Sequence, residues 1–439
     1  MPIAATDRAV ELRETILRLV REYTEIAHAP APFVPGTSKI TYAGRVFDAR
    51  ELENLVDSSL DFWLTSGPWT DRFEKQMRGF FGASDFALVN SGSSANLTMV
   101  TSLTTPLVKE PLVKGDEVVT PAVTFVTTLN PIIQNGLVPV FVDCEPGTYN
   151  ADPAALEEAI GPRTRALMLP HTLGNPFDLD RVVALAEKHG LYLLEDCCDA
   201  LGSTWGGKLV GTFGHLATLS FYPSHHMTMG EGGGVIVNRS TLVRPVQSVR
   251  DWGRDCWCAP GKSNTCGKRF GWHLGDLPEG FDHKYIYSCV GYNLKATDMQ
   301  AAIGVAQFDK LPGFIARRRE NFARLYSRLK RHEDRLILPK WLPKADPSWF
   351  GCPITVRPGT SRGALVQSLE ERNIETRNIL SGNVLRQPGY RDIPRRVVGD
   401  LRHSDTVMND SFFLGVYPGL TPSMVDYMAD SIDAFFANN

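Results

Sequence analysis

The stretch SFYPSHHMTMGEGGG, residues 220–234, decides how the rest of the chain is interpreted. A Ser-Phe pair opens it, a histidine pair lies in its middle and a glycine run closes it. His225 can act as a general base near neutral pH. His225 and His226 can equally be ordinary polar loop residues, because a short motif is only a hypothesis until its surroundings agree. The other motifs of the chain therefore decide whether the histidine pair is catalytic.

The segments around this stretch alternate between short apolar runs and helical patterns from about residue 50 to 310. Strand, helix, strand in this rhythm predicts a mainly parallel sheet covered on both faces, an α/β fold. Ligands of such sheets bind beyond the carboxyl ends of the strands. The expected strands are 117–120, 138–142, 166–170, 191–195, 218–222 and 234–237, and a helix is expected over 180–189.

Three parts are predicted along the chain. Residues 1–49 form an N-terminal helix and an extended arm, with Leu12, Ile16, Leu19 and Tyr23 on one helix face. Residues 50–310 form the large domain, interrupted at 240–290 by an aperiodic insertion rich in Gly, Cys and Trp. Residues 311–439 form a smaller C-terminal α+β domain that ends in a helix over 423–436.

Composition and charge place the chain among ordinary proteins of the cytoplasm. It has 439 residues, of which 43% are hydrophobic and 22% are charged, and this length suffices for two substantial domains. A net charge of −3 gives no reason to expect nucleic acid. No apolar run approaches membrane-spanning length and the N-terminus lacks a signal-peptide layout, so we expect a cytoplasmic protein without a membrane partner.

Several motifs occur in an order that one family shares: 90–96 (NSGSSAN), Phe125, the Glu-Asp pair ending at Asp196, 220–234 and 291–302 (GYNLKATDMQAA). Together they resemble the DegT/DnrJ/EryC1 sugar aminotransferases, whose fold is that of aspartate aminotransferase, the fold type I of PLP-dependent transferases. In that family a lysine five residues after the opening serine binds pyridoxal phosphate (PLP) covalently. Here that position is His225. The same exchange is found in sugar 3-dehydratases, and it implies pyridoxamine phosphate (PMP) held without a covalent bond.

The resemblance also implies roles for the other residues of the cofactor site. A glycine turn at a helix start suits a phosphate, which fits Gly92 and Ser93, although serine-rich helix caps are common. Asp196 would pair with the pyridine nitrogen; alternatively it is a capping or salt-bridged aspartate. The remaining expected members of the site are Asp199 near the ring hydroxyl, Phe125 stacked on the ring, Ser220, and Asn293, which would reach the phosphate across a homodimer interface.

Four of the eight cysteines have a spacing that resembles the 3-dehydratases with a 2Fe-2S cluster: Cys198, Cys256, Cys258 and Cys266. Such a cluster needs four thiolates. A structural zinc would use the same ligand types, and Cys197 is an alternative to Cys198. Basic residues around the insertion either balance thiolate charge, bind a flavin or iron–sulfur reductase, or are merely solvated.

The resemblance implies that the activity is C3 deoxygenation of a nucleotide-linked 4-keto-6-deoxyhexose. His225 is the expected base, and Arg377 and Asn383 are expected near the substrate nucleotide. CDP-4-keto-6-deoxy-D-glucose is the expected substrate, in a 3,6-dideoxyhexose pathway feeding lipopolysaccharide O-antigen. Two alternatives remain: a glutamate-coupled 3-dehydratase without a cluster, and a non-catalytic protein that binds PMP or a sugar nucleotide.

Overall fold

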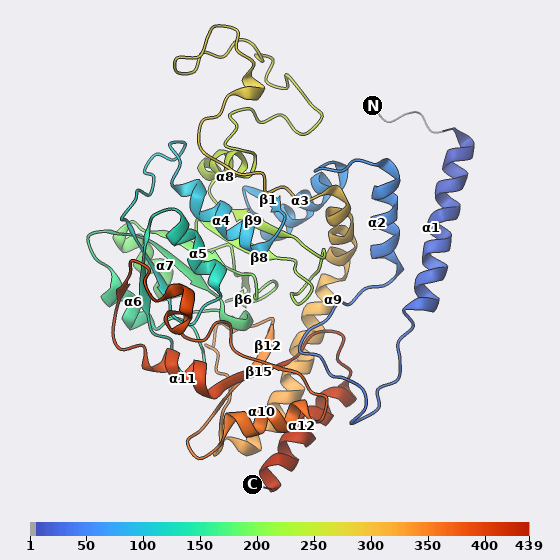
Figure 1. Ribbon diagram of the computed structural model, residues 1–439, viewed down its shortest axis with the longest axis vertical. Coiled ribbons are helices and arrows are strands. Elements are labelled where there is room, and N and C mark those ends of the chain that lie inside the picture. The colour runs from blue at the N-terminus through green and yellow to red at the C-terminus, as the bar shows by residue number, and fades with distance from the viewer. Residues whose placement is uncertain (1–5, 439) are drawn as a thin grey trace.

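The computed structural model describes residues 6–438, and an eight-stranded sheet forms its centre (Figure 1). The strand order is β1-β9-β8-β5-β4-β2-β3-β14. In this sheet β9 is antiparallel to both neighbours, and the other neighbouring pairs are parallel. The predicted mainly parallel sheet is therefore confirmed. Its strands are β1 (Asp85–Val89), β2 (Glu117–Pro121), β3 (Val138–Val142), β4 (Thr164–Pro170), β5 (Tyr192–Asp196), β8 (Leu216–Ser220), β9 (Gly233–Val237) and β14 (Arg396–Val397).

The strand before the histidine pair ends two residues earlier than predicted. β8 stops at Ser220, which pairs with Gly233 of β9. The amide of Phe221 then donates to the carbonyl of Gly232, and the amide of Met229 donates back to the carbonyl of Phe221. These bonds close a loop over residues 221–232, which projects from the carboxyl end of β8.

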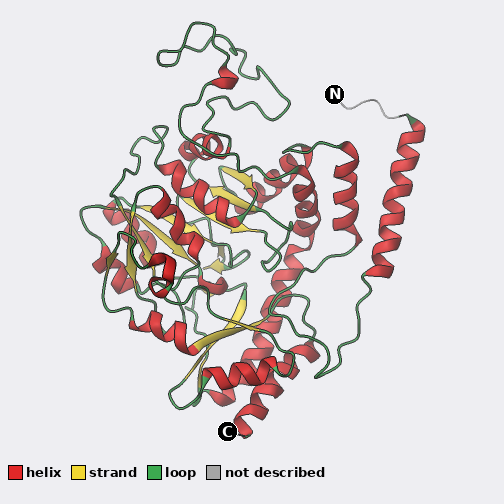
Figure 2. Cartoon of the chain, in the orientation of Figure 1, coloured by secondary structure: helices red, strands yellow, loops and turns green. Residues whose placement is uncertain are grey.

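Both faces of the sheet are buried under helices (Figure 2). Leu193 and Leu194, adjacent on β5, belong to two different hydrophobic clusters because neighbouring side chains point to opposite faces. This two-sided burial explains why the strands are continuous apolar runs in the sequence. The helices of this domain are α3 (Pro68–Phe81), α4 (Gly92–Leu103), α5 (Val126–Gln134), α6 (Pro153–Ala159), α7 (Leu179–His189) and α8 (Val243–Arg250).

A single long helix, α9 (Asp298–Leu329), joins the large domain to the small one. The predicted boundary at 310–311 falls inside this helix, whose start is fixed by a capping box between Thr297 and Gln300. The small domain has an antiparallel sheet of order β10-β12-β15-β13, and β14 returns from it to the large sheet. Its elements are β10 (Leu336–Ile337), β12 (Gly351–Val356), α10 (Arg362–Glu370), β13 (Thr376–Arg377), α11 (Arg402–Asp410), β15 (Ser411–Gly415) and α12 (Pro422–Ala437).

Three further segments complete the molecule. Helices α1 (Asp7–Ala27) and α2 (Ala49–Asp61) lie at one edge, and β6 (Thr204–Trp205), β7 (Lys208–Leu209) and β11 (Ala345–Asp346) form a small third sheet. The predicted insertion is partly helical, since α8 takes its first residues; the remainder forms long loops that extend above the large domain (Figure 1). Among the described residues, none of the helices combines the length and apolar character needed to span a membrane.

Candidate functional site

Four predicted site residues meet at the same edge of the sheet. Gly92 follows β1, Phe125 follows β2, Asp196 ends β5 and Ser220 ends β8. Strands β2, β5 and β8 run parallel within the sheet, and β1 runs in the same direction because β9 is antiparallel to both β1 and β8. The candidate site therefore lies at the carboxyl ends of the strands, where ligands of such sheets bind.

Helix α4 begins directly against Ser220. A β-carbon on Gly92 would lie 2.5 Å from Cβ of Ser220, so a larger residue cannot occupy this position without a shift. Ser91 caps the helix by accepting a 3.0 Å hydrogen bond from the amide of Ser94, and Ser93 is exposed on the first turn. The first-turn amides and the positive end of the helix dipole make this a suitable anion site. The arrangement fits the phosphate of the expected cofactor.

Asp196 is held in place by three hydrogen-bond donors at the end of β5. Its carboxylate accepts hydrogen bonds from Asn96 Nδ2 at 2.9 Å, Thr128 Oγ1 at 2.7 Å and the amide of Cys198 at 3.1 Å, and the residue is 6% exposed. Thr128 lies on α5, and the half-exposed ring of Phe125 precedes that helix. A buried carboxyl group beside an accessible aromatic ring fits the pyridine ring of the expected cofactor.

His225 lies in the loop after β8, with its side chain 16% exposed. Its Nε2 is 4.0 Å from Asp199 Oδ1, and its ring meets that of Phe350 edge to face at 5.4 Å between centroids. Burial, and then the charge of Arg318, lowers the pKa of His225 to about 3. The imidazole is therefore neutral at pH 7 and available to accept a proton, and its role as a general base remains a prediction. Its Nδ1 has no hydrogen-bond partner among the described residues.

Asp199 faces His225, and its pKa is shifted in the opposite direction. Burial, and then the charge of Asp196, raises the pKa of Asp199 to about 7, although Arg318 acts in the other direction. A carboxyl group and an imidazole with pKa values displaced in opposite directions are typical of acid–base sites. The role of Asp199 near the ring hydroxyl remains a prediction.

Arg318 is a residue that the sequence analysis missed. It lies on α9 with 1% exposure, and its guanidinium donates to the carbonyls of Trp349 and Phe350, both at 3.2 Å, and of His225 at 3.1 Å. Burial lowers the pKa of Arg318 to about 9. Arg317 and Arg319 flank it in the sequence. No local pattern separates the three, and tertiary packing alone identifies the buried one.

Two other predicted binding residues, Asn293 and Arg377, are exposed to solvent. Asn293 is exposed, and its Oδ1 accepts from Lys295 Nζ at 3.0 Å. Its role across a dimer interface remains a prediction. Arg377 is exposed on β13, with its guanidinium over the ring of Tyr42.

Asn383 lies beside the site but faces inward. It pairs with Val123, just ahead of Phe125 in the chain, so its loop adjoins the candidate site. It is, however, wholly buried, donates to Asp405 Oδ1 at 2.7 Å and accepts from the amide of Leu385 at 3.1 Å. In this structure the side chain of Asn383 stabilises its own loop, and its role near the substrate nucleotide remains a prediction.

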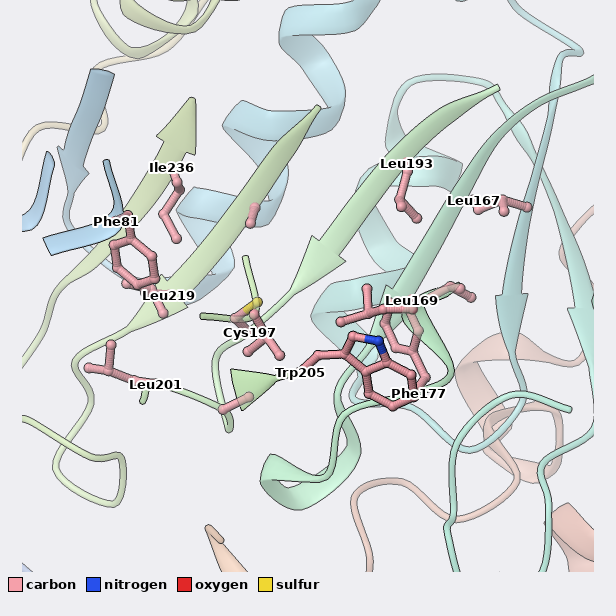
Figure 3. Packing of buried hydrophobic residues seen from close by; sticks show 14 of the residues in the cluster. Phe81, Leu167, Leu169, Phe177, Leu193, Cys197, Leu201, Trp205, Leu219 and Ile236 are labelled. Carbon is pink, nitrogen blue, oxygen red and sulfur yellow. The ribbon is translucent and has the colours of Figure 1, made fainter. Parts of the chain in front are cut away.

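The two adjacent cysteines that follow β5 have different surroundings. Cys197 is 1% exposed in the hydrophobic cluster of the large domain, near Trp205 and Leu169 (Figure 3). Cys198 lies on the other side, where its amide binds Asp196 and the charge of Asp196 helps burial to raise the pKa of its thiol. Cys198 is therefore the cysteine beside Asp196, and its role as a cluster ligand remains a prediction.

The other three cysteines of the predicted set lie in the loops of the insertion. The amide of Cys258 approaches Cys256 Sγ at 3.4 Å, and Cys266 Sγ lies 4.0 Å from Nδ1 of the buried His283. Among residues 6–438, the side chains that cluster closely enough to hold a metal ion are His171, Glu195 and Cys197, in the core. The four predicted ligands are not brought together in this way, and the cluster remains a prediction.

The fold and the strand-end site define a PLP-dependent transferase of fold type I. The family model for DegT/DnrJ/EryC1/StrS aminotransferases matches residues 46–433, and the chain belongs to this family. It is 50% identical to the lipopolysaccharide biosynthesis protein RfbH of Salmonella typhimurium, over 98% of this chain and 99% of that protein. It is 49% identical to the dTDP-4-dehydro-2,6-dideoxy-D-glucose 3-dehydratase of Saccharopolyspora spinosa, over 99% of this chain and 94% of that protein.

Among solved structures, the chain is similar to a GDP-4-keto-6-deoxymannose-3-dehydratase that holds a trapped PLP-glutamate geminal diamine. The TM-score is 0.81 at 28% identity, covering 90% of this chain and all of the other. The chain is thus close to sugar-nucleotide 3-dehydratases and aminotransferases, and the predicted fold class is confirmed.

Proposed function

We propose that this protein is a PMP-dependent 3-dehydratase of a nucleotide-linked 4-keto-6-deoxyhexose. The observation that carries the proposal is His225: it occupies the position of the family's lysine, at the strand end that also carries Asp196, and it is neutral at pH 7. Relatives named as 3-dehydratases of dTDP-linked and GDP-linked sugars support it. CDP-4-keto-6-deoxy-D-glucose remains the substrate that we would test first.

The site residues would have three roles: binding the cofactor phosphate, pairing with the pyridine nitrogen, and transferring a proton. Gly92, at the start of α4, and Ser220, at the end of β8, would hold the cofactor phosphate, and the Asp196 carboxylate would hold the pyridine nitrogen. When bound, PMP supplies an amine for the C4 ketone and a ring that withdraws electrons. His225 would take the proton whose removal drives loss of the C3 hydroxyl. Because its imidazole is neutral and nearly enclosed, it can accept that proton without competition from bulk water.

Two routes could complete the reaction after loss of the C3 hydroxyl: one coupled to glutamate and one that uses an iron–sulfur cluster. The glutamate-coupled route is the better supported, since the solved relative carries glutamate joined to PLP. The iron–sulfur route, with a separate reductase, rests on the spacing of Cys198, Cys256, Cys258 and Cys266 and on the place of Cys198 beside Asp196. No contact between Cys198 and the insertion supports the second route among the described residues.

Turnover assays with PMP test the proposal. We expect the purified protein to convert CDP-, dTDP- or GDP-4-keto-6-deoxyhexose into a sugar that lacks the C3 hydroxyl, detected by mass spectrometry. An amino sugar as the product would identify an aminotransferase and overturn the proposal. Binding of PMP or the sugar nucleotide without any turnover, with glutamate or with a reductase, would favour a non-catalytic binding protein.

The two routes can be distinguished by the iron and sulfide content of the protein and by the co-substrate that turnover requires. Dependence on L-glutamate, in protein purified without iron, would select the glutamate-coupled route. About two irons and two acid-labile sulfides per chain after anaerobic purification, with turnover only when a reductase is present, would select the iron–sulfur route.

A further inference from the structure

Lys295 is almost fully enclosed, although lysine is ordinarily a surface residue. Its side chain is 8% exposed, and its Nζ lies 2.5 Å from Asp251 Oδ1 and 3.0 Å from Asn293 Oδ1. The same ammonium group lies over the ring of Trp252, 3.8 Å from its centre. A carboxylate, a carboxamide and an aromatic face thus surround one positive charge.

The ammonium group fixes the orientation of the Asn293 side chain. An ammonium has three N–H donors and no acceptor, so the amide oxygen of Asn293 is the atom that faces Lys295. The Nδ2 group is therefore directed away from Lys295, and no group within residues 6–438 accepts a hydrogen bond from it. The neighbouring charge also polarises the amide, which makes Nδ2 a stronger donor. Because Asn293 is exposed, this donor is available to an anionic ligand.

The segment that carries Asn293 is bonded to the turn of the proposed phosphate site. The amide of Asn90 donates to the carbonyl of Leu294 at 2.8 Å. Asn90 in turn accepts a 2.6 Å hydrogen bond on its Oδ1 from the hydroxyl of Ser94, in the first turn of α4. The backbone next to Asn293 is therefore anchored where the amides at the start of α4 are available to an anion.

The residues that hold Lys295 lie where the loops of the insertion begin, directly after α8. Asp251 pairs with Asn293 in an antiparallel bridge, and the amide of Trp252 donates to the carbonyl of Tyr292 at 2.7 Å. Trp252 has a φ of 62°, in the left-handed region that an aromatic residue keeps only where its surroundings impose it. Backbone and side-chain contacts thus join the two segments around the ammonium group.

An ion pair that is mostly buried connects these segments to the large sheet. Arg250, 15% exposed, donates from Nε to Asp251 Oδ2 at 3.3 Å and from Nη1 to Glu74 Oε1 at 2.7 Å. Glu74 Oε1 also accepts from the amide of Leu88, in β1, at 2.8 Å. The place of Lys295 is thus determined by contacts that continue to the strand before the phosphate site.

We propose that Lys295 is a positioning residue for the cofactor: it holds the amide oxygen of Asn293 and thereby leaves Nδ2 free to donate to the cofactor phosphate. This inference rests on the proposed function, because the phosphate concerned is that of PMP or PLP. Lys295 does not bind the phosphate itself, since its three neighbours already occupy its ammonium group. Its role is the same whether the phosphate belongs to this chain or to a second copy. The first residues of the insertion, Asp251 and Trp252, then support cofactor binding whether or not the cysteines hold a metal.

Paired titrations with PMP and with pyridoxamine, which lacks the phosphate, test this role. In Lys295→Met the dissociation constant for PMP, measured by fluorescence, should rise about tenfold, the effect of losing one hydrogen bond to a charged group. The dissociation constant for pyridoxamine should be unchanged, whereas a purely structural defect would weaken both ligands alike. Lys295→Arg, which keeps the charge and the donors, should recover most of the affinity for PMP.

The matched control is Lys310→Met. Lys310 is also largely enclosed, with its side chain 18% exposed, and it pairs with Glu51 at 2.6 Å. It lies on α9 and takes no part in the contacts around Lys295. The ratio of the dissociation constants for PMP and pyridoxamine should therefore stay at the value of the parent protein.

A double-mutant cycle identifies the residue through which Lys295 acts. Asn293→Ala should weaken PMP binding by itself, and Lys295→Met should cause no further loss in that background. Additive losses, or an equal weakening of PMP and pyridoxamine, would overturn the inference. Thermal unfolding shows whether Lys295→Met is folded. If it is not, Asp251→Asn, which keeps the lysine and removes the charge that holds it, should give a smaller loss of the same phosphate-dependent kind.

These outcomes differ from a failure of the proposed function. A parent protein that binds PMP more tightly than pyridoxamine but produces no 3-deoxy sugar would overturn the proposed function, and the cycle would still decide the role of Lys295. A parent protein whose affinity does not depend on the phosphate would overturn the inference, whatever its turnover.

Discussion

The guanidinium of Arg318 donates a 3.1 Å hydrogen bond to the backbone carbonyl of His225. The same group holds the carbonyls of Trp349 and Phe350, which lead into β12 of the small domain. One buried side chain on α9 thus connects the loop of the proposed base to the second domain. The position of the imidazole therefore depends on contacts between parts of the chain that are far apart in the sequence.

We expect Arg318→Met to lower both the stability and the activity of the protein. Three buried carbonyls lose a charged donor, so the free energy of unfolding should fall by about 3 kcal/mol or more in urea titrations. The turnover number should fall further than the remaining fold explains, and Arg318→Lys should recover part of it. Arg317→Met is the matched control, because Arg317 is exposed and pairs with Glu320. Equal losses in both Met variants would contradict the assignment.

Replacing His225 tests whether it acts in proton transfer or in cofactor binding. His225→Asn should reduce the turnover number by about 10²–10⁴-fold, the usual contribution of a general base, while the affinity for PMP changes little. PMP affinity is measured by fluorescence titration. A parallel loss of PMP binding would assign His225 to binding rather than to proton transfer.

Restoring an amine at the same position tests the geometry. His225→Lys should form a covalent link to added PLP, which borohydride fixes as a mass increase on that peptide. His226→Lys is the control: His226 is 2% exposed and its Nε2 contacts the carbonyl of Ser348 at 2.7 Å, facing away from the site. Labelling of residue 226 rather than 225 would show that the loop is oriented differently.

The turnover number should depend on pH through the ionisation of Asp199. Its raised pKa, about 7, means that the carboxyl group loses its proton as the pH rises through neutrality. The new negative charge, 4.0 Å from Nε2, favours the protonated imidazole and so makes His225 a stronger base. The turnover number should therefore rise between about pH 6 and 8, and this rise should be absent in Asp199→Asn. A rise that persists in the variant would exclude Asp199 as its source.

Asp196 should control cofactor affinity. In Asp196→Asn the charge that would face the pyridine nitrogen is removed, and the donors from Asn96 and Thr128 face an amide instead. We expect the dissociation constant for PLP to rise at least about tenfold, equivalent to about 1.4 kcal/mol. Thr128→Val, which removes one donor and keeps the charge, should give a smaller change. If both variants bind equally well, the carboxylate is not a cofactor ligand.

The sequence alone predicted the mainly parallel sheet and the residues at its strand ends. Apolar runs of a strand buried on both faces, and turns with Gly92 or Asp196 at their ends, are local patterns, so they are readable without coordinates. The exchange of lysine for His225 is likewise a property of one position. These features determined the family and the chemistry that we propose.

Tertiary structure decided what depends on distant groups. The pKa of His225 is low because other elements bury its ring and because the charge of Arg318 lies nearby. Likewise, only the tertiary structure shows that Asp405 and Leu385 bind the side chain of Asn383. One capping box begins a helix that continues past residue 310, where the sequence predicted a domain boundary. Burial and through-space charge are set by packing between segments, and a linear pattern does not encode which segments pack.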